Sequence, residues 1–387
     1  MLVIDETGSW DSESIPDSLS NLRAIYPQHG DAVLVAPTTQ MVVSSLIQLD
    51  GWSRNVIFLP KGVDLPVIPS SASGIDSRTK WCLFTSGTTG SPKLISHHLE
   101  TLKSLISTSS ATSSFVWGLL YEPIRMAGIQ VLVQAISTNT KVVVPTINWS
   151  MASKVQFMKE QGVTALSATP TIWRQILQTN ESVDWALEQV SLGGEIADQK
   201  ILDALQSRFP KARVAHIFAS TETSAAFSVT DGVEGFPVSY LDASPKGIKL
   251  AVIDDVLHVF LPTSDLATSD GYVSTGDLVE IVNDRVLFRG RASGVINVGG
   301  AKVFPENVET VLRRHEFVID AVVRGKQNPF SGEVVIAEVQ LQENAPADAI
   351  KTLKKWAKEH LESYAVPVTI KSVTTLTHNS NGKSLRT

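Results

Sequence analysis

One short segment of the sequence combines the groups that bind polyphosphates. Residues 83–93 read LFTSGTTGSPK, an apolar run followed by a loop of Gly, Ser and Thr that ends on a lysine. Such a loop offers backbone N–H groups, hydroxyls and one cation to phosphate oxygens, and its glycines let the backbone turn tightly beside a ligand. Pro92 separates Gly90 from Lys93, so the loop is not a Walker A motif that runs into a helix. The segment predicts a phosphate-binding loop, with a polar surface turn as the alternative.

A second polar group follows a strand-like run later in the chain. The apolar run over residues 213–218 leads directly into Ser220, Thr221 and Glu222. Polar residues at the carboxyl end of a strand stand where open α/β sheets bind their ligands. The alternative is that Thr221 and Glu222 cap the helix that follows.

Taken together with the loop, four further stretches resemble the motifs of a known superfamily. In order, the five are TSGTTGSPK at 85–93, FASTE at 218–222, STGD at 274–277, the segment from GR at 290–291 to GG at 299–300, and NGKSLR at 381–386. This series resembles the adenylate-forming superfamily of acyl-CoA synthetases, aryl-CoA ligases, peptide-synthetase adenylation domains and firefly luciferase. The resemblance covers roughly residues 80–387, and the chain is most similar to an N-terminally shortened acyl- or aryl-CoA ligase.

The resemblance implies an ATP-dependent acid–thiol ligase that works in two steps. A carboxylate attacks the α-phosphorus of ATP to give an acyl-adenylate and pyrophosphate, and a thiol then displaces AMP to give a thioester. The first step brings an anion against a polyanion, so cations and N–H groups are needed where negative charge builds up. The expected acceptor is coenzyme A, and the phosphopantetheine arm of a carrier protein is the alternative.

The same resemblance assigns the residues that would handle ATP. The residues expected to bind its phosphates are Thr85, Ser86, Gly87, Thr88, Thr89, Gly90 and Lys93. Thr221 would contact the α-phosphate, and Glu222 would hold Mg²⁺, a hard cation that prefers oxygen ligands. Lys383 would reach between the carboxylate and the α-phosphate as a point charge. Thr221, Glu222 and Lys383 are therefore the expected catalytic residues, although a solvated lysine in the tail is the alternative for Lys383.

Further residues are implied for the nucleoside, the acyl group and the thiol. Asp277 would accept hydrogen bonds from both ribose hydroxyls, because a carboxylate offers two acceptors to a diol. Arg291 would reach the ribose or the phosphates. The residues expected beside adenine and the acyl pocket are Gly193, Gly194, Glu195, Phe218 and Ala219. Gly299 and Gly300 would line the channel for the pantetheine thiol, with a simple β-turn as the alternative.

The sequence departs from the family pattern at several points. Only about 80 residues precede the phosphate loop, which predicts a shortened N-terminal region that a partner protein could cover. Ala219 stands where the family has glycine, and Ser293 stands at a hinge position that is usually Asp or Lys. Arg125 aligns with a histidine of the acyl pocket. It could clamp a carboxylate bidentately, or it could be a surface or structural arginine.

These departures leave a second hypothesis open, a non-catalytic helper that binds a carrier protein. The shortened N-terminal region, Ser293 and Ala219 are features that a retired enzyme could have. The polar residues that such a helper has no reason to retain are Lys93, Glu222, Asp277, Arg291 and Lys383. Their retention favours catalysis.

Composition excludes several other classes of function. The 387 residues carry a net charge of −6 with no block of Lys and Arg, which argues against nucleic acid and anionic membranes as partners. The single cysteine, Cys82, permits no intrachain disulfide and fits a reducing compartment. No signal peptide and no apolar run of membrane-spanning length is present, so we expect a cytoplasmic protein.

Periodicity indicates the elements that must position these groups. Strand-like and helix-like segments alternate over the first two-thirds of the chain, which is typical of α/β proteins. The expected strands are 32–35, 56–59, 141–144, 164–168 and 213–218, and the expected helices are 99–106, 151–160, 170–177 and 201–205. Short antiparallel strands then follow at 248–253, 256–260, 279–282 and 286–288, before helices around 308–315 and 350–364.

These elements predict an α/β fold with two domains. A length of 387 residues exceeds what one ordinary core supports. Residues 1–290 are expected to form a large ATP- and acyl-binding α/β domain with an added small antiparallel β layer. Residues 291–387 are expected to form a small, mobile α+β lid.

Overall fold

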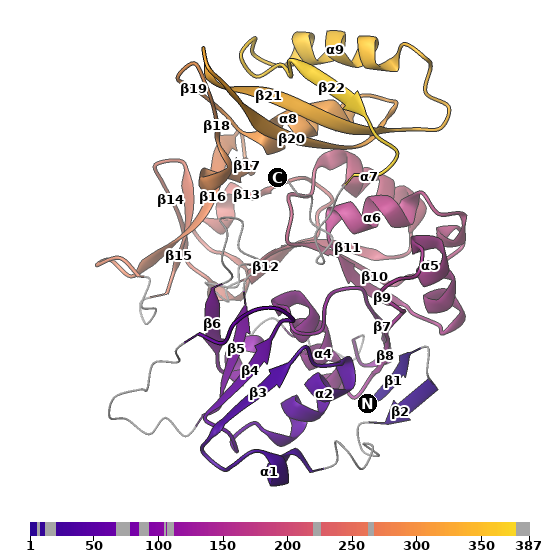
Figure 1. Cartoon of the computed structure of the whole chain (residues 1–387), viewed down its shortest axis with the longest axis vertical. Helices are drawn as coiled ribbons and strands as arrows, with labels where there is room; N and C mark the ends of the chain where they lie inside the picture. The colour runs from indigo at the N-terminus through magenta and orange to yellow at the C-terminus, as the bar shows by residue number, and fades with distance from the viewer. Residues whose placement is uncertain are drawn as a thin grey trace.

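The structure is a computed structural model of the chain. It describes residues 1–5, 8–11, 21–66, 78–84, 93–103, 106, 112–219, 226–261 and 267–376. The helices are α1 Leu22–Ile25, α2 Thr39–Gln48, α3 Leu99–Lys103, α4 Met126–Thr138, α5 Met151–Glu160, α6 Pro170–Leu177, α7 Gln199–Arg208, α8 Pro305–Arg314 and α9 Ala349–His360. In Figure 1 the chain runs from the N-terminal elements at the bottom to α9 and β22 at the top.

The largest sheet runs through the middle of the chain in the order β12-β11-β10-β9-β7-β8-β1-β2. Neighbours from β7 to β11 pair in parallel, and the two edge pairs are antiparallel. Their apolar runs are buried by α5, α6 and α7, which pack into one core with them. The strands are β1 Leu2–Asp5, β2 Gly8–Asp11, β7 Val116–Leu119, β8 Lys141–Val143, β9 Ala165–Ala168, β10 Gln189–Gly193, β11 Arg213–Ala219 and β12 Ala226–Val229.

A second sheet has the order β3-β4-β5-β6, and the predicted phosphate loop falls between its strands β5 and β6 in the sequence. Its first three strands are parallel, and β6 returns antiparallel to β5. Every residue of β4 is buried, which explains its continuous apolar sequence. Side chains of α2 and α4 fill the core shared with the large sheet. The strands are β3 Asp31–Val35, β4 Asn55–Leu59, β5 Lys80–Phe84 and β6 Leu94–His97.

The predicted small antiparallel layer is a third sheet, of order β13-β17-β16-β15-β14. All its pairs are antiparallel, and its core joins aromatic rings from the strands and from neighbouring loops. The strands are β13 Phe236–Pro237, β14 Leu250–Ile253, β15 Val256–Phe260, β16 Tyr272–Val282 and β17 Arg285–Arg291.

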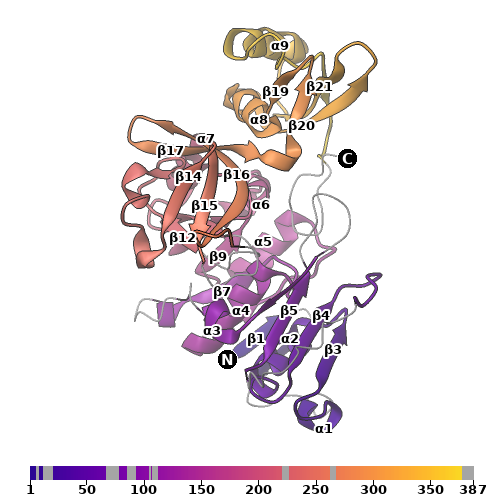
Figure 2. The ribbon, with the colours of Figure 1, turned by 90° about the vertical axis from the view of Figure 1, so that its left-hand side faces the viewer.

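The C-terminal unit is an α+β layer. A long β20–β21 hairpin and a short β18–β19 hairpin form its sheet, with β22 parallel to β21. Helices α8 and α9 bury Val308, Leu312 and Leu353 against it. Figure 2 places this unit at the opposite end of the molecule from β3 and β4. The strands are β18 Ile296–Val298, β19 Ala301–Val303, β20 Val318–Asn328, β21 Gly332–Leu341 and β22 Thr369–Ser372.

These elements confirm the predicted fold class of a large α/β unit with an antiparallel layer and a smaller α+β unit. The chain passes from the third sheet to the C-terminal sheet between Arg291 and Ile296. The division into folding units at residues 290 and 291, and the mobility of the second unit, stay predictions. No helix in the described parts of the chain has the length and apolar character that crossing a membrane requires.

Buried charges join the C-terminal unit to the large one. Arg174 on α6 binds Asp198, the N-cap of α7, at 2.6 Å. On the other side, Arg313 of α8 binds Asp320 of β20 at 2.7 Å. The two pairs meet across the junction, with 3.7 Å from Arg313 to Asp198 and 4.0 Å from Arg174 to Asp320. Each of these four side chains is at most 10% exposed. We call these four residues the junction cluster.

The junction cluster holds its charges in spite of burial. Burial alone would raise the pKa of Asp320, but Arg313 and Arg174 outweigh it and hold that pKa below its ordinary value. Separating such pairs leaves charges buried without a partner, which costs about 3–5 kcal/mol when one partner is removed. The cluster therefore favours one orientation of the C-terminal unit.

Lys200 adds a direct bridge across the same junction. Its Nζ donates hydrogen bonds to the carbonyl oxygens of Arg313, His315 and Val318, the last two at 3.1 Å. These carbonyls lie at and just after the C-terminal end of α8, where the helix dipole favours a cation.

Replacing Lys200 with Met should loosen the junction, because the stem stays and three charge-assisted hydrogen bonds are lost. We expect amide hydrogen exchange over residues 316–321 to become about tenfold faster, which corresponds to the free energy that one such hydrogen bond contributes. Lys159→Met is the matched control, since Lys159 donates to Val183 O at 2.7 Å within the large unit. Unchanged exchange in Lys200→Met would contradict the bridge.

A second prediction concerns His216 on β11. Its pKa is lowered from 6.5 to about 4, chiefly by burial and also by Arg285, against the opposing effects of Asp231 and of a backbone hydrogen bond with Gly235. Its Nε2 is enclosed and has no hydrogen-bond partner among the described residues. Because the unfolded chain binds the proton more tightly, His216 stabilises the fold fully above pH 6.5, and this contribution is lost as the pH falls toward 4.

Replacing His216 with Gln should therefore flatten the acid side of the stability profile. Between pH 7 and pH 5 we expect the wild type to lose about 1–2 kcal/mol more free energy of unfolding than His216→Gln. Urea titrations at the two pH values measure this difference. Parallel losses in both proteins would mean that His216 titrates normally in the folded state.

Candidate active site

The phosphate-loop segment connects two paired strand ends. Phe84, the last residue of β5, lies opposite Leu94, the first residue of β6. Thr85 to Pro92 fall outside the described residues, so their predicted phosphate contacts stay predictions. Lys93 is exposed directly before β6. The structure thus describes the two ends of the loop, which close on each other as a hairpin does.

Arg125 lies against the strand that leads into this loop. It occupies the N-cap position of α4, and its Nη1 donates to the carbonyl oxygen of Phe84 at 3.0 Å. Its Nε donates to Oε2 of Glu122 at 2.9 Å. The guanidinium therefore makes a structural ion pair, the alternative that the sequence left open. The predicted contact with a substrate carboxylate stays untested.

A second group of predicted residues lies at the carboxyl end of β10. Gly193 ends this strand, and Gly194 turns the backbone with a φ of 81°. Glu195 then accepts a hydrogen bond from the backbone N–H of Thr171, in the first turn of α6, at 3.0 Å. A carboxylate at this helix N-terminus is favourable because the N–H groups there have no partner within the helix.

Tyr121, which the sequence did not single out, belongs to the same region. It follows β7, and its hydroxyl bonds to the side chain of Ser167 on β9. Burial raises the pKa of this hydroxyl above its ordinary value, and the nearby Glu195 raises it further. Tyr121, Ser167 and Glu195 thus bring polar groups together from the carboxyl ends of neighbouring parallel strands, where such sheets bind ligands.

Phe218 and Ala219 end β11, one strand further along the same sheet. The ring of Phe218 stacks on Phe227 and Phe288, with centroids 5.4 and 5.3 Å away. This contact ties the end of β11 to the core of the antiparallel layer. Thr221 and Glu222 follow directly but lie outside the described residues.

The structure brings Asp277 and Arg291 together. They lie opposite each other on β16 and β17, and Arg291 Nε donates to Asp277 Oδ1 at 2.9 Å. Arg291 Nη2 also donates to the carbonyl oxygen of Thr275 at 3.1 Å. Gly276 allows the turn between Thr275 and Asp277 with a φ of 71°. The carboxylate is thereby held beside the last residue of β17, and it is 17% exposed.

The predicted hinge and thiol channel lie beyond this pair. Ser293 is exposed in a short 3₁₀ turn that connects β17 to β18. Gly299 and Gly300 form the two-residue turn between β18 and β19, with φ values of 57° and 89°. Two positive φ angles are what a tight hairpin turn requires, so a structural reason for both glycines is present. Their role toward a thiol stays a prediction.

The predicted catalytic lysine and metal ligand cannot be placed. Lys383 and Glu222 lie outside the described residues, and within the described part of the chain no group of three or more His, Cys, Asp and Glu could hold a metal ion. A single carboxylate still suits Mg²⁺, since this ion keeps several waters and takes other ligands from nucleotide phosphates.

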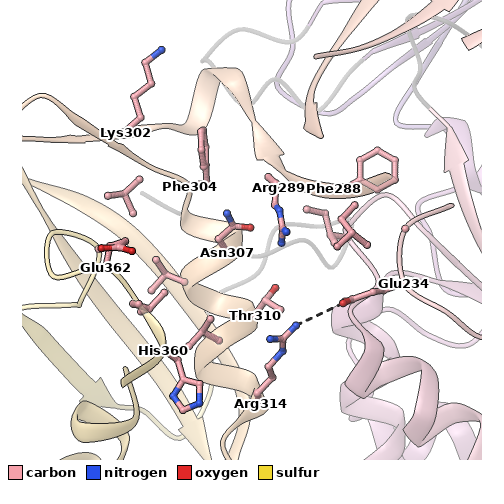
Figure 3. Close-up of a pocket in the computed structure, with 18 of the residues that line it drawn as sticks. Glu234, Phe288, Arg289, Lys302, Phe304, Asn307, Thr310, Arg314, His360 and Glu362 are labelled. Atoms are coloured by element: carbon pink, nitrogen blue, oxygen red, sulfur yellow. Dashed lines mark ion pairs between the residues drawn. The ribbon is translucent and has the colours of Figure 1, made fainter. Parts of the chain in front are cut away.

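A separate cavity of about 590 Å³ lies on the junction between the two units. Its walls come from β17, α8, the end of α9 and the segment around Glu234. Figure 3 shows Arg314 pointing from α8 toward Glu234, and the pair is 3.7 Å apart. None of the predicted site residues lines this cavity. Because it is built from both units, it depends on their present orientation.

Comparison with known proteins gives the family. A family model of AMP-binding enzymes matches residues 69–264, more than half of the chain, and a model of the AMP-binding enzyme C-terminal domain matches residues 307–383. The chain is 25% identical over 377 residues to a 2-succinylbenzoate–CoA ligase of Staphylococcus aureus strain Newman. That alignment covers 90% of this chain and 74% of the relative.

Solved structures with the same fold include two CoA ligases. A benzoate CoA ligase from Burkholderia xenovorans LB400 has a TM-score of 0.75 at 17% identity, with 99% of this chain and 95% of that chain covered. An o-succinylbenzoate CoA synthetase from Bacillus subtilis, in complex with its acyl-adenylate intermediate, has a TM-score of 0.66 at 17% identity, with 99% and 94% covered. The resemblance drawn from the five motifs is thus confirmed, and the chain belongs to the AMP-binding enzyme family.

Proposed function

We propose that the chain is an AMP-forming acid–thiol ligase, which activates a carboxylic acid with ATP and transfers the acyl group to coenzyme A. The observation that carries this proposal is the match of both units of the chain to models of AMP-binding enzymes. The curated relatives, which are named as CoA ligases, support the thioester as the product. The match favours an enzyme over a non-catalytic carrier-binding helper.

The proposed nucleotide site draws on two strand ends of the large unit and on the antiparallel layer. The loop after β5 would receive the phosphates, and the segment after β10 would lie beside adenine and the acyl group. The Asp277 carboxylate, held by Arg291 at 2.9 Å, would accept the ribose hydroxyls. Arg291 holds this carboxylate in one orientation before the ligand arrives, which lowers the cost of binding.

The chemistry follows from charge. In the first step a carboxylate oxygen bonds to the α-phosphorus while the bond to pyrophosphate breaks. Lys383 would place a positive charge between the two anions, and Thr221 would donate a hydrogen bond to the α-phosphate. Mg²⁺ held by Glu222, when bound, supplies charge to the phosphate oxygens. In the second step the thiol sulfur bonds to the acyl carbon, AMP leaves, and the thiol proton is released.

The acceptor and the acid belong to the proposal as well. Coenzyme A is favoured over a carrier-protein phosphopantetheine because the curated relatives are named as CoA ligases. An aromatic acid is favoured because relatives and fold neighbours are named for 2-succinylbenzoate and benzoate. The partner that could cover the region before the phosphate loop, and the cytoplasmic location, stay predictions.

The test is ATP-dependent pyrophosphate release with Mg²⁺ over a panel of aliphatic and aromatic acids, with and without coenzyme A. We expect release with one class of acid, and a rise in turnover when coenzyme A is added. Release that coenzyme A does not stimulate would point to a carrier protein as the acceptor. No release with any acid, from folded protein that does not bind ATP, would contradict the proposal.

Lys383→Ala is the variant for the same assay. The loss of a charge that acts on the transition state should lower the rate of pyrophosphate release about 10²–10³-fold while the protein still binds ATP. Lys355→Ala is the control, because the Lys355 side chain is 80% exposed and makes a surface ion pair with Glu359 of the same helix at 3.8 Å. Unchanged release in Lys383→Ala would remove this lysine from the first step.

A further inference from the structure

The guanidinium of Arg125 bridges two elements that the proposed reaction must keep in register. Its Nε donates to Glu122 Oε2 at 2.9 Å, and its Nη1 donates to the carbonyl oxygen of Phe84 at 3.0 Å. We propose that Arg125 is a positioning residue, which holds the start of the phosphate-binding loop against the turn that follows β7. This inference rests on the proposed function for the identity of the loop.

The contact acts where a small shift matters most. Phe84 is 4% exposed, and it is the last paired residue of β5 before the loop, with Leu94 opposite it. Thr85, the first residue of the predicted loop, follows Phe84 in the sequence, so Arg125 acts on the chain at the point where that segment begins. Misplacement of a reacting group by about 1 Å can cost about 10²-fold in rate.

Arg125 reaches this carbonyl from a different sheet. Phe84 belongs to the β3–β6 sheet, whereas Arg125 begins α4 after β7 of the large sheet. The turn that carries Arg125 is itself tight. The Arg125 N–H bonds to Glu122 O at 3.1 Å, and a Cβ on Gly128 would collide with that same oxygen. The guanidinium thus holds the end of β5 at a fixed distance from this rigid turn.

The chemistry of arginine fits this task better than that of lysine. A planar guanidinium donates to two acceptors in fixed directions, whereas an ammonium is a point charge on a flexible stem. The pair with Glu122 is 18% and 24% exposed, so water screens it little. Nε and Nη1 each donate to a protein acceptor, so the guanidinium plane is fixed by the protein and only its three remaining N–H groups are left for any other partner.

The two roles of Arg125 predict different kinetics for Arg125→Met. A positioning role raises the KM for ATP about tenfold, the loss of one charged hydrogen bond, and leaves the KM for the acid within about twofold. A substrate clamp would instead raise the KM for the acid and leave the KM for ATP unchanged. Arg125→Lys should restore part of the ATP affinity, since one of the two bonds can be kept. A raised KM for the acid with normal ATP affinity would overturn the inference.

A matched control and a readout without nucleotide separate this inference from the proposed function. Arg54 donates to His29 O at 3.1 and 2.9 Å near the other end of the same sheet, so Arg54→Met should leave both KM values unchanged. In ATP-free protein, amide exchange over Leu94–His97 should be several-fold faster in Arg125→Met than in Arg54→Met. Equal exchange rates in Arg125→Met and Arg54→Met would overturn the positioning role of Arg125, whether or not the protein uses ATP. If Arg125→Met fails to fold, Glu122→Gln is the alternative variant, because it keeps the arginine. It should show a smaller rise in the KM for ATP and a smaller rise in amide exchange over Leu94–His97.

Discussion

The position of the C-terminal unit depends on a small set of buried charges. Arg174, Asp198, Arg313 and Asp320 approach one another across the junction, and each is nearly removed from water. Charges in such a place contribute little net stability, but they strongly penalise any arrangement that leaves one of them unpaired. The cluster thus selects an orientation more than it strengthens the fold. β22, the last described strand before Lys383 in the sequence, belongs to this unit.

The large unit places its polar groups by a different rule, the common direction of parallel strands. β5, β7, β10 and β11 each end at a predicted functional segment or next to one. Parallel pairing brings the ends of β7, β10 and β11 to the same edge of the large sheet, so residues about 100 positions apart in the chain can serve one ligand. Arg125 connects the end of β5 to the turn after β7, and the Asp277–Arg291 pair joins β16 to β17 within the antiparallel layer. Function in this fold is a property of strand ends and of the contacts that hold them in register.

Much of this fold could be predicted from local pattern, and most of its long-range contacts could not. The continuous apolar runs of β3 and β4 and the helical periodicity of α8 and α9 fixed those elements within a few residues. The β1–β2 hairpin was missed, because strands of four residues are too short to show a period and β1 gains its place in the large sheet by pairing with β8. The junction cluster was also missed, since pairs such as Arg174–Asp320 leave no mark at any fixed spacing. Glu122 could have been found, because opposite charges three residues apart near a helix start are a local signal.

The most direct test of the proposed ligase follows one oxygen atom. If the carboxylate attacks the α-phosphorus, an acid labelled with ¹⁸O in its carboxylate must leave one labelled oxygen in AMP when the thiol takes the acyl group. The account predicts one ¹⁸O atom in each AMP, none in pyrophosphate, and no formation of ADP. Label in inorganic phosphate together with ADP would mean activation at the γ-phosphorus, and it would contradict the acyl-adenylate.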